Sequence, residues 1–114
     1  MHSAVYLLDV AHPPRPADTI ETQLLEAWQM VRNSPTLRVM KVIHGYGSSG
    51  KGGSSRETVR NWAFQRKSRL RAVIDGEHYS VRNRVIEELL KDVGPLGDPD
   101  LDAGNPGITI LWVR

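Results

Sequence analysis

The segment from His44 to Glu57 reads HGYGSSGKGGSSRE, and it decides how the chain is divided into structural elements. An apolar run, VMKVI at residues 39–43, leads into this segment, and a helix-like pattern follows it. A strand, a glycine-rich loop and a helix in this order are typical of an α/β fold. The glycines of the loop fit more than one known motif, so the same segment bears on function.

Three glycines of the loop match the G-x-G-x-x-G motif of dinucleotide-binding folds, namely Gly45, Gly47 and Gly50. That motif places its third glycine in the first turn of the helix, whereas residues 51–54 separate Gly50 from the helix here. Residues 45–51 also fit a P-loop, but Gly52 stands where a P-loop has the hydroxyl that binds Mg²⁺. A nucleotide-binding protein that uses residues 45–51 as a phosphate cradle is therefore the weakest of the functional alternatives.

Four apolar runs predict strands, at residues 4–10, 37–43, 70–75 and 108–113. Helical patterns lie between these runs. Asp18 and Ser80 are expected to cap the first and the last of the three helices, and the middle helix is expected at residues 55–67. Residues 94–107 are rich in turn-forming residues and are predicted to form a mobile loop.

The order βαβαβ(α)β predicts a single α/β domain over residues 1–114, built on a mixed four-stranded sheet. Two crossover helices would join the first three strands, which are expected to run parallel, and the third helix is an extra C-terminal one. Ligands of such sheets bind at the carboxyl ends of the strands. Asp9 lies near that end of the first strand and His44 just past that of the second. If the two strands are neighbours, both side chains are expected at one edge of the sheet.

Composition sets limits on the class of protein. The chain has 114 residues, of which 39% are hydrophobic and 25% are charged, as in ordinary globular proteins. The absence of cysteine excludes disulfides and thiolate metal sites. No apolar run approaches the ~18 residues that span a bilayer, and the N-terminus lacks a signal-peptide pattern. We therefore expect a cytoplasmic protein without a membrane partner.

The charges are distributed unevenly along the chain. Residues 51–71 contain seven basic side chains and one acidic one, whereas residues 75–102 contain eight acidic and three basic ones. The net charge of +2 hides this asymmetry. A basic surface of this kind attracts polyanions, which indicates nucleic acid as a partner.

Four motifs follow one another along the chain, namely LDV at residues 8–10, HGYG at 44–47, the basic helix at 55–67, and GNPGITI at 104–110. In this order they resemble the Smr (small MutS-related) domain family. The family pattern is a strand ending in L-D-x-H, a second strand running into H-G-x-G, a basic helix, and a glycine-rich turn before the last strand. The resemblance implies nucleic-acid binding and, as in many members, endonuclease activity on DNA or RNA. A non-catalytic RNA- or DNA-binding module is the alternative.

The resemblance implies a site that the chemistry of the residues can support. His44 could act as a general acid or base, and Asp9 could orient its imidazole, activate a water or hold Mg²⁺ or Mn²⁺. Glycines allow a phosphate to approach the backbone, and the following helix N-terminus favours negative charge. Tyr46 could stack on a base. The residues expected to bind substrate are Gly45, Tyr46, Gly47, Gly50, Lys51, Arg56 and Arg60.

The first motif departs from the family pattern. Ala11 stands where the family has histidine, and His12 comes one position later. In a continuing strand a shift of one residue reverses the direction of a side chain, whereas a loop starting at Ala11 could bring the imidazole back. His12 is therefore the third candidate catalytic residue. These residues do not distinguish RNA from DNA as the target. We expect weak sequence selectivity, because the residues are directed at phosphates rather than at base edges.

Overall fold

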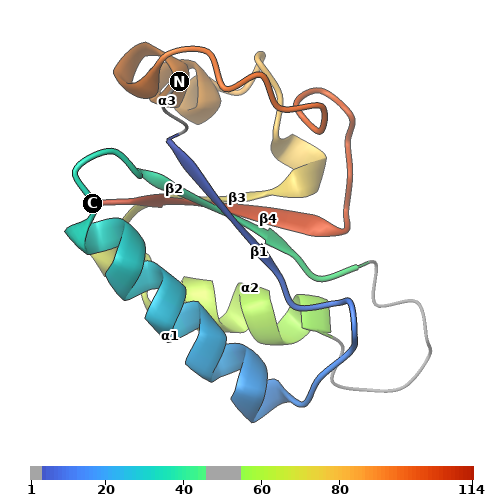
Figure 1. Ribbon diagram of the computed structural model, residues 1–114. Helices are drawn as coiled ribbons and strands as arrows, with labels where there is room; N and C mark the ends of the chain where they lie inside the picture. The colour runs from blue at the N-terminus through green and yellow to red at the C-terminus, as the bar shows by residue number, and fades with distance from the viewer. Residues whose placement is uncertain (1–3, 46–54) are drawn as a thin grey trace.

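The computed structural model describes residues 4–45 and 55–114 and consists of one sheet with helices on both faces (Figure 1). The strands are β1 (Val5–Asp9), β2 (Val39–Ile43), β3 (Leu70–Asp75) and β4 (Ile108–Val113). The helices are α1 (Ala17–Asn33), α2 (Ser55–Gln65) and α3 (Arg84–Val93), and two 3₁₀ turns flank β3, namely η1 (Lys67–Arg69) and η2 (Gly76–His78). The predicted mixed four-stranded sheet and extra C-terminal helix are confirmed.

The strands follow the order β1-β2-β4-β3 across the sheet. β1 and β2 are parallel neighbours, and β4 is antiparallel both to β2 and to β3. β3 therefore runs in the same direction as β1 and β2, as the sequence predicts, but β4 separates it from them. This insertion of the last strand makes the sheet mixed.

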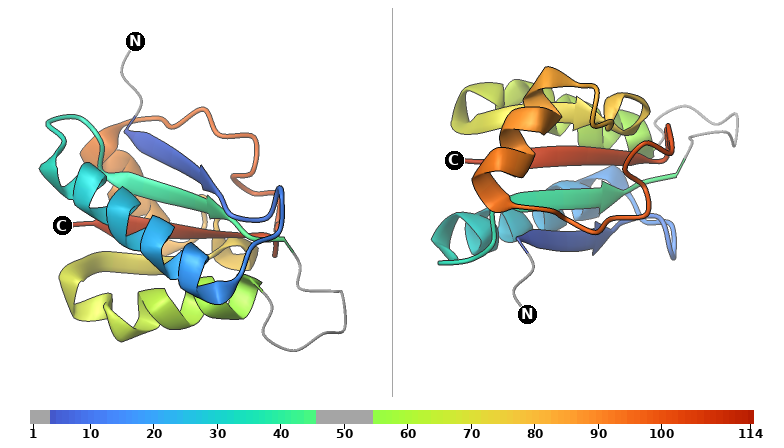
Figure 2. Two further views of the ribbon diagram at one scale, coloured as in Figure 1. Left: turned by 60° about the horizontal axis from the view of Figure 1, so that its bottom comes forward. Right: turned by 90° about the horizontal axis from the view of Figure 1, so that it is seen from above.

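Each face of the sheet has its own hydrophobic core. α1 and α2 cover one face, and α3 covers the other (Figures 1 and 2). The buried residues of α1 recur at the helical period, namely Ile20, Leu24, Ala27, Trp28 and Val31. All six residues of β4 are buried, which explains why its sequence, ITILWV, is almost continuously apolar. No helix within the described ranges is long and apolar enough to cross a membrane.

The helix caps differ from those that the sequence predicts. α1 already contains Asp18 in its first turn, where a negative charge is favourable, so Asp18 is not the cap. α3 begins directly after Asn83, whose Oδ1 accepts the backbone N–H groups of Val85 and Ile86 at 2.8 and 3.4 Å. Asn83 rather than Ser80 is therefore the N-cap of α3.

A buried lysine in β2 holds part of the 94–107 segment against the sheet. Lys41 Nζ lies 2.7 Å from Asp98 Oδ1 and 2.5 Å from Asp100 Oδ2, and Tyr79 Oη donates to Asp98 Oδ2 at 3.0 Å. Burial lowers the pKa of Lys41, but the two carboxylates outweigh this and hold it above its ordinary value. The sequence predicts that this loop is mobile, but ion pairs of Asp98 and Asp100 with Lys41 join it to the middle of β2.

Candidate functional site

The carboxyl ends of β1 and β2 meet at one edge of the sheet. Asp9 is in register with Ile43, and the backbone N–H of Val10 donates to the carbonyl of Ile43 at 2.9 Å. His44 follows directly, so Asp9 and His44 lie at the same edge, as expected for neighbouring parallel strands. Their side chains nevertheless have different partners.

Asp9 forms a pair with His12. The Asp9 carboxylate accepts the backbone N–H groups of Ala11 and His12 at 2.8 and 3.1 Å, which turns the chain back at the end of β1. The His12 ring returns with it and places Nδ1 2.9 Å from Asp9 Oδ2. Burial raises the pKa of Asp9, but the hydrogen bonds from Ala11 and His12 outweigh it and lower the pKa below its ordinary value.

The geometry of this pair leaves one imidazole nitrogen for chemistry. Because an ionised carboxylate only accepts hydrogen bonds, His12 Nδ1 carries the proton that faces Asp9. Nε2 of the neutral ring is then a proton acceptor, and the His12 side chain is 76% exposed. The histidine that is displaced by one position in the sequence therefore reaches the carboxylate after all.

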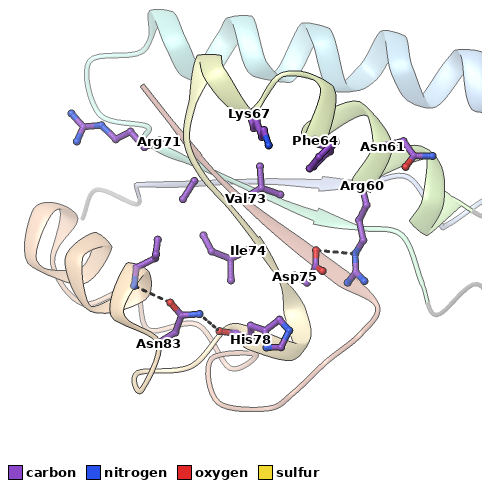
Figure 3. A pocket seen from close by; sticks show the side chains of 12 residues that line it. Arg60, Asn61, Phe64, Lys67, Arg71, Val73, Ile74, Asp75, His78 and Asn83 are labelled. Atoms are coloured by element: carbon purple, nitrogen blue, oxygen red, sulfur yellow. Dashed lines mark hydrogen bonds and ion pairs between the residues drawn. The ribbon is translucent and has the colours of Figure 1, made fainter.

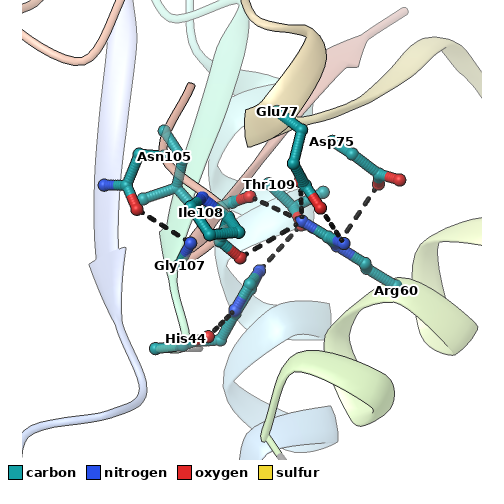
Figure 4. A network of polar contacts seen from close by, with 10 residues as sticks. His44, Arg60, Asp75, Glu77, Asn105, Gly107, Ile108 and Thr109 are labelled. Carbon is teal, nitrogen blue, oxygen red and sulfur yellow. Dashed lines mark hydrogen bonds and ion pairs between the residues drawn. The ribbon is translucent and has the colours of Figure 1, made fainter. Parts of the chain in front are cut away.

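His44 lies in a closed environment. Its side chain is buried, with Nδ1 2.8 Å from the carbonyl oxygen of Gly45 and Nε2 2.8 Å from Thr109 Oγ1 (Figure 4). Since a carbonyl can only accept, Nδ1 carries the proton, and Nε2 accepts from the Thr109 hydroxyl. Burial is the main reason that the pKa of His44 lies below its ordinary value; the Gly45 carbonyl raises it, and the charges of Arg60 and Arg56 lower it again.

Arg60 is the centre of the same polar network. Its Nε donates to Thr109 Oγ1 at 3.0 Å, and its Nη2 donates to Glu77 Oε1 at 2.7 Å and to the Ile108 carbonyl at 3.2 Å (Figure 4). Asp75 Oδ1 lies 3.3 Å from Nε. The hydrogen bond from Arg60 holds the pKa of Glu77 below its ordinary value, against the effect of burial. The arginine that the sequence assigns to substrate is thus already paired with two carboxylates.

The turn before β4 packs against the start of the glycine segment. The Gly107 carbonyl accepts the backbone N–H groups of both His44 and Gly45, at 2.9 and 3.0 Å. Asn105 Oδ1 in turn accepts the N–H of Gly107 at 2.8 Å. A Cβ on Gly76 would lie 1.9 Å from the carbonyl oxygen of Asn105, so only glycine fits there. The closing turn and the H-G pair, which are far apart in the sequence, form one structural unit.

The remaining predicted residues are distributed as follows. Gly45 has a φ of +78°, which glycine adopts without strain, and Arg56 lies in the first turn of α2, close enough for its charge to act on His44. Tyr46, Gly47, Gly50 and Lys51 lie outside the described residues. Sequence reasoning missed three members of the network, Thr109, Glu77 and Asn105. The only available signal was the single polar residue within the apolar run of β4.

The basic residues of the middle segment divide between two edges of the sheet. Arg56 and Arg60 lie towards the carboxyl edge, because Arg60 contacts Thr109 at the beginning of β4 and Asp75 at the end of β3. Arg66 and the turn η1 come at the other end of α2, directly before β3 begins at the opposite edge. The positive charge that the sequence predicts as one cluster is therefore spread over the length of the strands.

Asp9 is the only one of the proposed catalytic residues whose carboxylate could bind a divalent cation. Within residues 4–45 and 55–114, no group of three or more histidine, aspartate or glutamate side chains is arranged to hold a metal ion. A cation at this edge would thus need further ligands from substrate phosphates or water, as Mg²⁺ commonly has.

Comparison with protein families, with curated proteins and with solved structures gives no match to this chain. The resemblance to Smr domains therefore depends on the four sequence motifs alone.

Proposed function

We propose that this protein binds nucleic acid through its phosphates and cleaves phosphodiester bonds, with Asp9 and His12 as the acid–base pair. The observation that supports the proposal is the contact of 2.9 Å between His12 Nδ1 and Asp9 Oδ2, in a pair whose imidazole is exposed at the carboxyl edge. A carboxylate that orients one ring nitrogen leaves the other free to move a proton, as in hydrolase triads.

The chemistry assigned to the pair is proton transfer at His12 Nε2. This nitrogen would take a proton from the attacking hydroxyl or water as its oxygen bonds to phosphorus, while the Asp9 carboxylate fixes the ring and stabilises the imidazolium that forms. The P–O bond to the leaving oxygen would break in the same step, and that oxygen would receive a proton from water or from the imidazolium. Gly45 follows β2, the strand next to β1, so a phosphate bound at Gly45 and Arg56 would lie at the same edge as Asp9 and His12. A Mg²⁺ or Mn²⁺ ion bound to Asp9 would supply charge stabilisation to the phosphate.

A second candidate function has its own support. In the HGYG motif, His44 is buried and both of its ring nitrogens are engaged, which suits a residue that shapes the phosphate site rather than one that transfers protons. If His12 does not act on substrate either, the protein is a non-catalytic RNA- or DNA-binding module. In both cases we propose that it acts in the cytoplasm.

The test compares binding with cleavage in matched variants. Labelled single-stranded RNA and supercoiled plasmid are incubated with the wild type, Asp9→Asn and His12→Ala, each with Mg²⁺, Mn²⁺ or a chelator. His78→Ala, which changes an exposed histidine on η2, is the control for a non-specific effect of removing a histidine. We expect Asp9→Asn and His12→Ala to lower cleavage by ~100-fold and to leave binding within a few-fold, since a lost acid–base group acts on the rate.

Two results would contradict the proposal that the protein cleaves nucleic acid. Binding of polynucleotide without cleavage under any metal condition would favour the non-catalytic module. Absence of polynucleotide binding by the wild type would contradict both candidates.

A further inference from the structure

The outer edge of β3 carries a groove that the proposed nuclease site does not use. β3 is an edge strand of the sheet, and within the described residues its only strand neighbour is β4. A hollow of about 730 Å³ runs along its free side (Figure 3). Backbone N–H and C=O groups on the free side of an edge strand lack strand partners and can pair with another chain.

The two walls of the groove come from opposite faces of the sheet. Phe64 and Lys67 reach it from the end of α2 and from η1, and Asn83 and Val85 reach it from the start of α3. The floor is formed by the middle of β3, around Val73. A strand laid along this floor would direct its alternate side chains towards the two walls, because side chains of a strand point to opposite faces.

One wall carries an exposed aromatic ring. The Phe64 side chain is 65% exposed, and Lys67 Nζ lies 4.4 Å from the centre of its ring. A large apolar side chain kept in solvent beside unpaired backbone is typical of an interaction surface. The groove therefore combines apolar contact area with hydrogen-bonding capacity.

Unpaired positive charge is concentrated at one end of the groove. Within residues 4–45 and 55–114, neither Lys67 nor Arg71 forms an ion pair, and the Arg71 guanidinium lies 5.3 Å from the centre of the Trp112 ring. At the other end, Arg60 is paired with the Asp75 carboxylate (Figure 3). An acidic group on a ligand would therefore be favoured at the end that carries Lys67 and Arg71.

We propose that this groove binds an extended peptide segment, which adds to β3 as a fifth strand. Its apolar side chains would pack between Phe64 and Val85, and an Asp or Glu at one end would contact Lys67 and Arg71. Main-chain hydrogen bonds supply affinity in this mode of recognition, and the wall pockets supply selectivity. A polypeptide suits the site better than a polynucleotide, because only a polypeptide offers a regular series of N–H and C=O groups that can pair with the free side of β3.

The local backbone supports a short added strand. Residues 72–75 pair regularly with β4, whereas the register shifts between Leu70 and Ala72. An irregularity and a charged residue, here Arg71, are common protections of an edge against non-specific pairing. Regular pairing is thus available only along the part of β3 that forms the floor of the groove.

The test begins with peptides selected for binding to the whole protein. Random ten-residue peptides displayed on phage are selected on the wild type, and the enriched sequence is synthesised with a fluorophore for anisotropy titration. Arg71→Glu is the test variant and Arg32→Glu is its matched control, because the Arg32 guanidinium also lies 5.3 Å from a tryptophan ring, that of Trp28 in α1. Thermal unfolding of each variant verifies the fold.

We expect the enriched peptides to alternate apolar residues and to carry Asp or Glu near one end. Arg71→Glu should weaken binding by about tenfold or more through like-charge repulsion, whereas Arg32→Glu should leave it unchanged. Phe64→Ala, which truncates an exposed ring, should also weaken binding. N-methylation of the peptide at every second residue should abolish binding at one phase and leave it intact at the other, because only alternate N–H groups of an added strand face β3.

Three results would overturn this inference. They are equal effects of Arg71→Glu and Arg32→Glu, tolerance of N-methylation at every peptide position, and displacement of the peptide by single-stranded oligonucleotide. The last result would assign the groove to nucleic acid.

Discussion

His12 and His44 both lie close to the carboxyl edge of the sheet, but their surroundings favour opposite roles. The His12 side chain is 76% exposed and uses one ring nitrogen to contact Asp9, whereas His44 is 3% exposed and both of its ring nitrogens are engaged. A group that transfers protons to a substrate must be able to contact it. A buried imidazole whose two ring nitrogens both have hydrogen-bond partners within the protein suits a structural role instead. We therefore assign the proposed proton transfer to His12 rather than to His44.

The burial of His44 predicts how stability depends on pH. Its pKa in the folded protein lies below the ordinary 6.5, so the unfolded chain binds more protons than the folded one as the pH falls through this range. The contribution of His44 is therefore fully present above pH 6.5 and is lost as the pH falls towards the lower, folded-state pKa. We expect the free energy of unfolding in urea to decrease from pH 7 to pH 5, and His44→Gln to flatten this decrease.

The control for this prediction is His78→Gln. This substitution removes an exposed histidine of η2, and the variant should keep the pH dependence of the wild type. An unchanged pH dependence in His44→Gln would show that the imidazole is not held neutral by burial.

Among the helices, α3 begins at a different residue from the one that the sequence predicts: Asn83 rather than Ser80 is its N-cap. Ser80 and Asn83 are both good N-cap residues, and three positions separate them. Ser80 Oγ instead accepts the backbone N–H of Arg82 at 3.2 Å, within the turn that precedes the helix. Local preference alone did not distinguish the two, because the turn that follows η2 decides where the helix can begin.

We expect Asn83→Ala to lower the free energy of unfolding by about 1 kcal/mol, the usual contribution of a lost N-cap. Urea unfolding followed by circular dichroism measures this change. Asn61→Ala, in the exposed part of α2, is the control and should have little effect. An equal effect of the two substitutions would contradict the assignment of Asn83 as the cap.

Much of the sheet could be predicted because all four strands read as short apolar runs, and because its two central strands, β2 and β4, are almost entirely buried. The existence of four strands and the parallel direction of β1, β2 and β3 followed from this pattern and from the crossover rule. The adjacency of β1 and β2, on which a shared site of Asp9 and His44 depends, is shown by the structure. The position of β4 between β2 and β3 could not be predicted, since it depends on packing between residues that are far apart in the sequence. The same is true of Lys41, which the sequence places in an apolar strand and whose partners, Asp98 and Asp100, lie in the 94–107 segment.

For the whole molecule, the main feature is the spread of positive charge along the strand direction. Arg56 lies near the carboxyl edge, whereas Arg66 and Arg69 lie at the opposite end of α2 and in η1. The number of these charges is read directly from the sequence, but their distribution in space is not. The sequence also did not indicate that Arg60 would be paired with Asp75 and Glu77. A polyanion that contacts Arg56 as well as Arg66 and Arg69 must therefore run along the surface parallel to the strands.

This distribution predicts the salt dependence of nucleic-acid binding. If about four of the basic side chains meet phosphates of a duplex, the slope of log K against log salt concentration should be roughly −3 to −4. The double substitution Arg66→Ala/Arg69→Ala should bring the slope about two closer to zero, and it is measured by anisotropy on a duplex of about 20 base pairs. Arg82→Ala, before α3, is the control and should leave the slope unchanged. A slope close to zero in the wild type would indicate a partner other than a polyanion.

Chemical rescue tests whether the exposed imidazole of His12, oriented by Asp9, carries the proton transfer. The rate of nucleic-acid cleavage is measured for His12→Ala in the absence and presence of free imidazole, with His44→Ala measured in parallel. The exposure of the His12 side chain leaves room for imidazole to enter in its place. We predict that His12→Ala lowers the rate by ~100-fold, that imidazole restores a saturable part of it, and that His44→Ala is not rescued. A cleavage rate in His12→Ala equal to that of the wild type would contradict the claim.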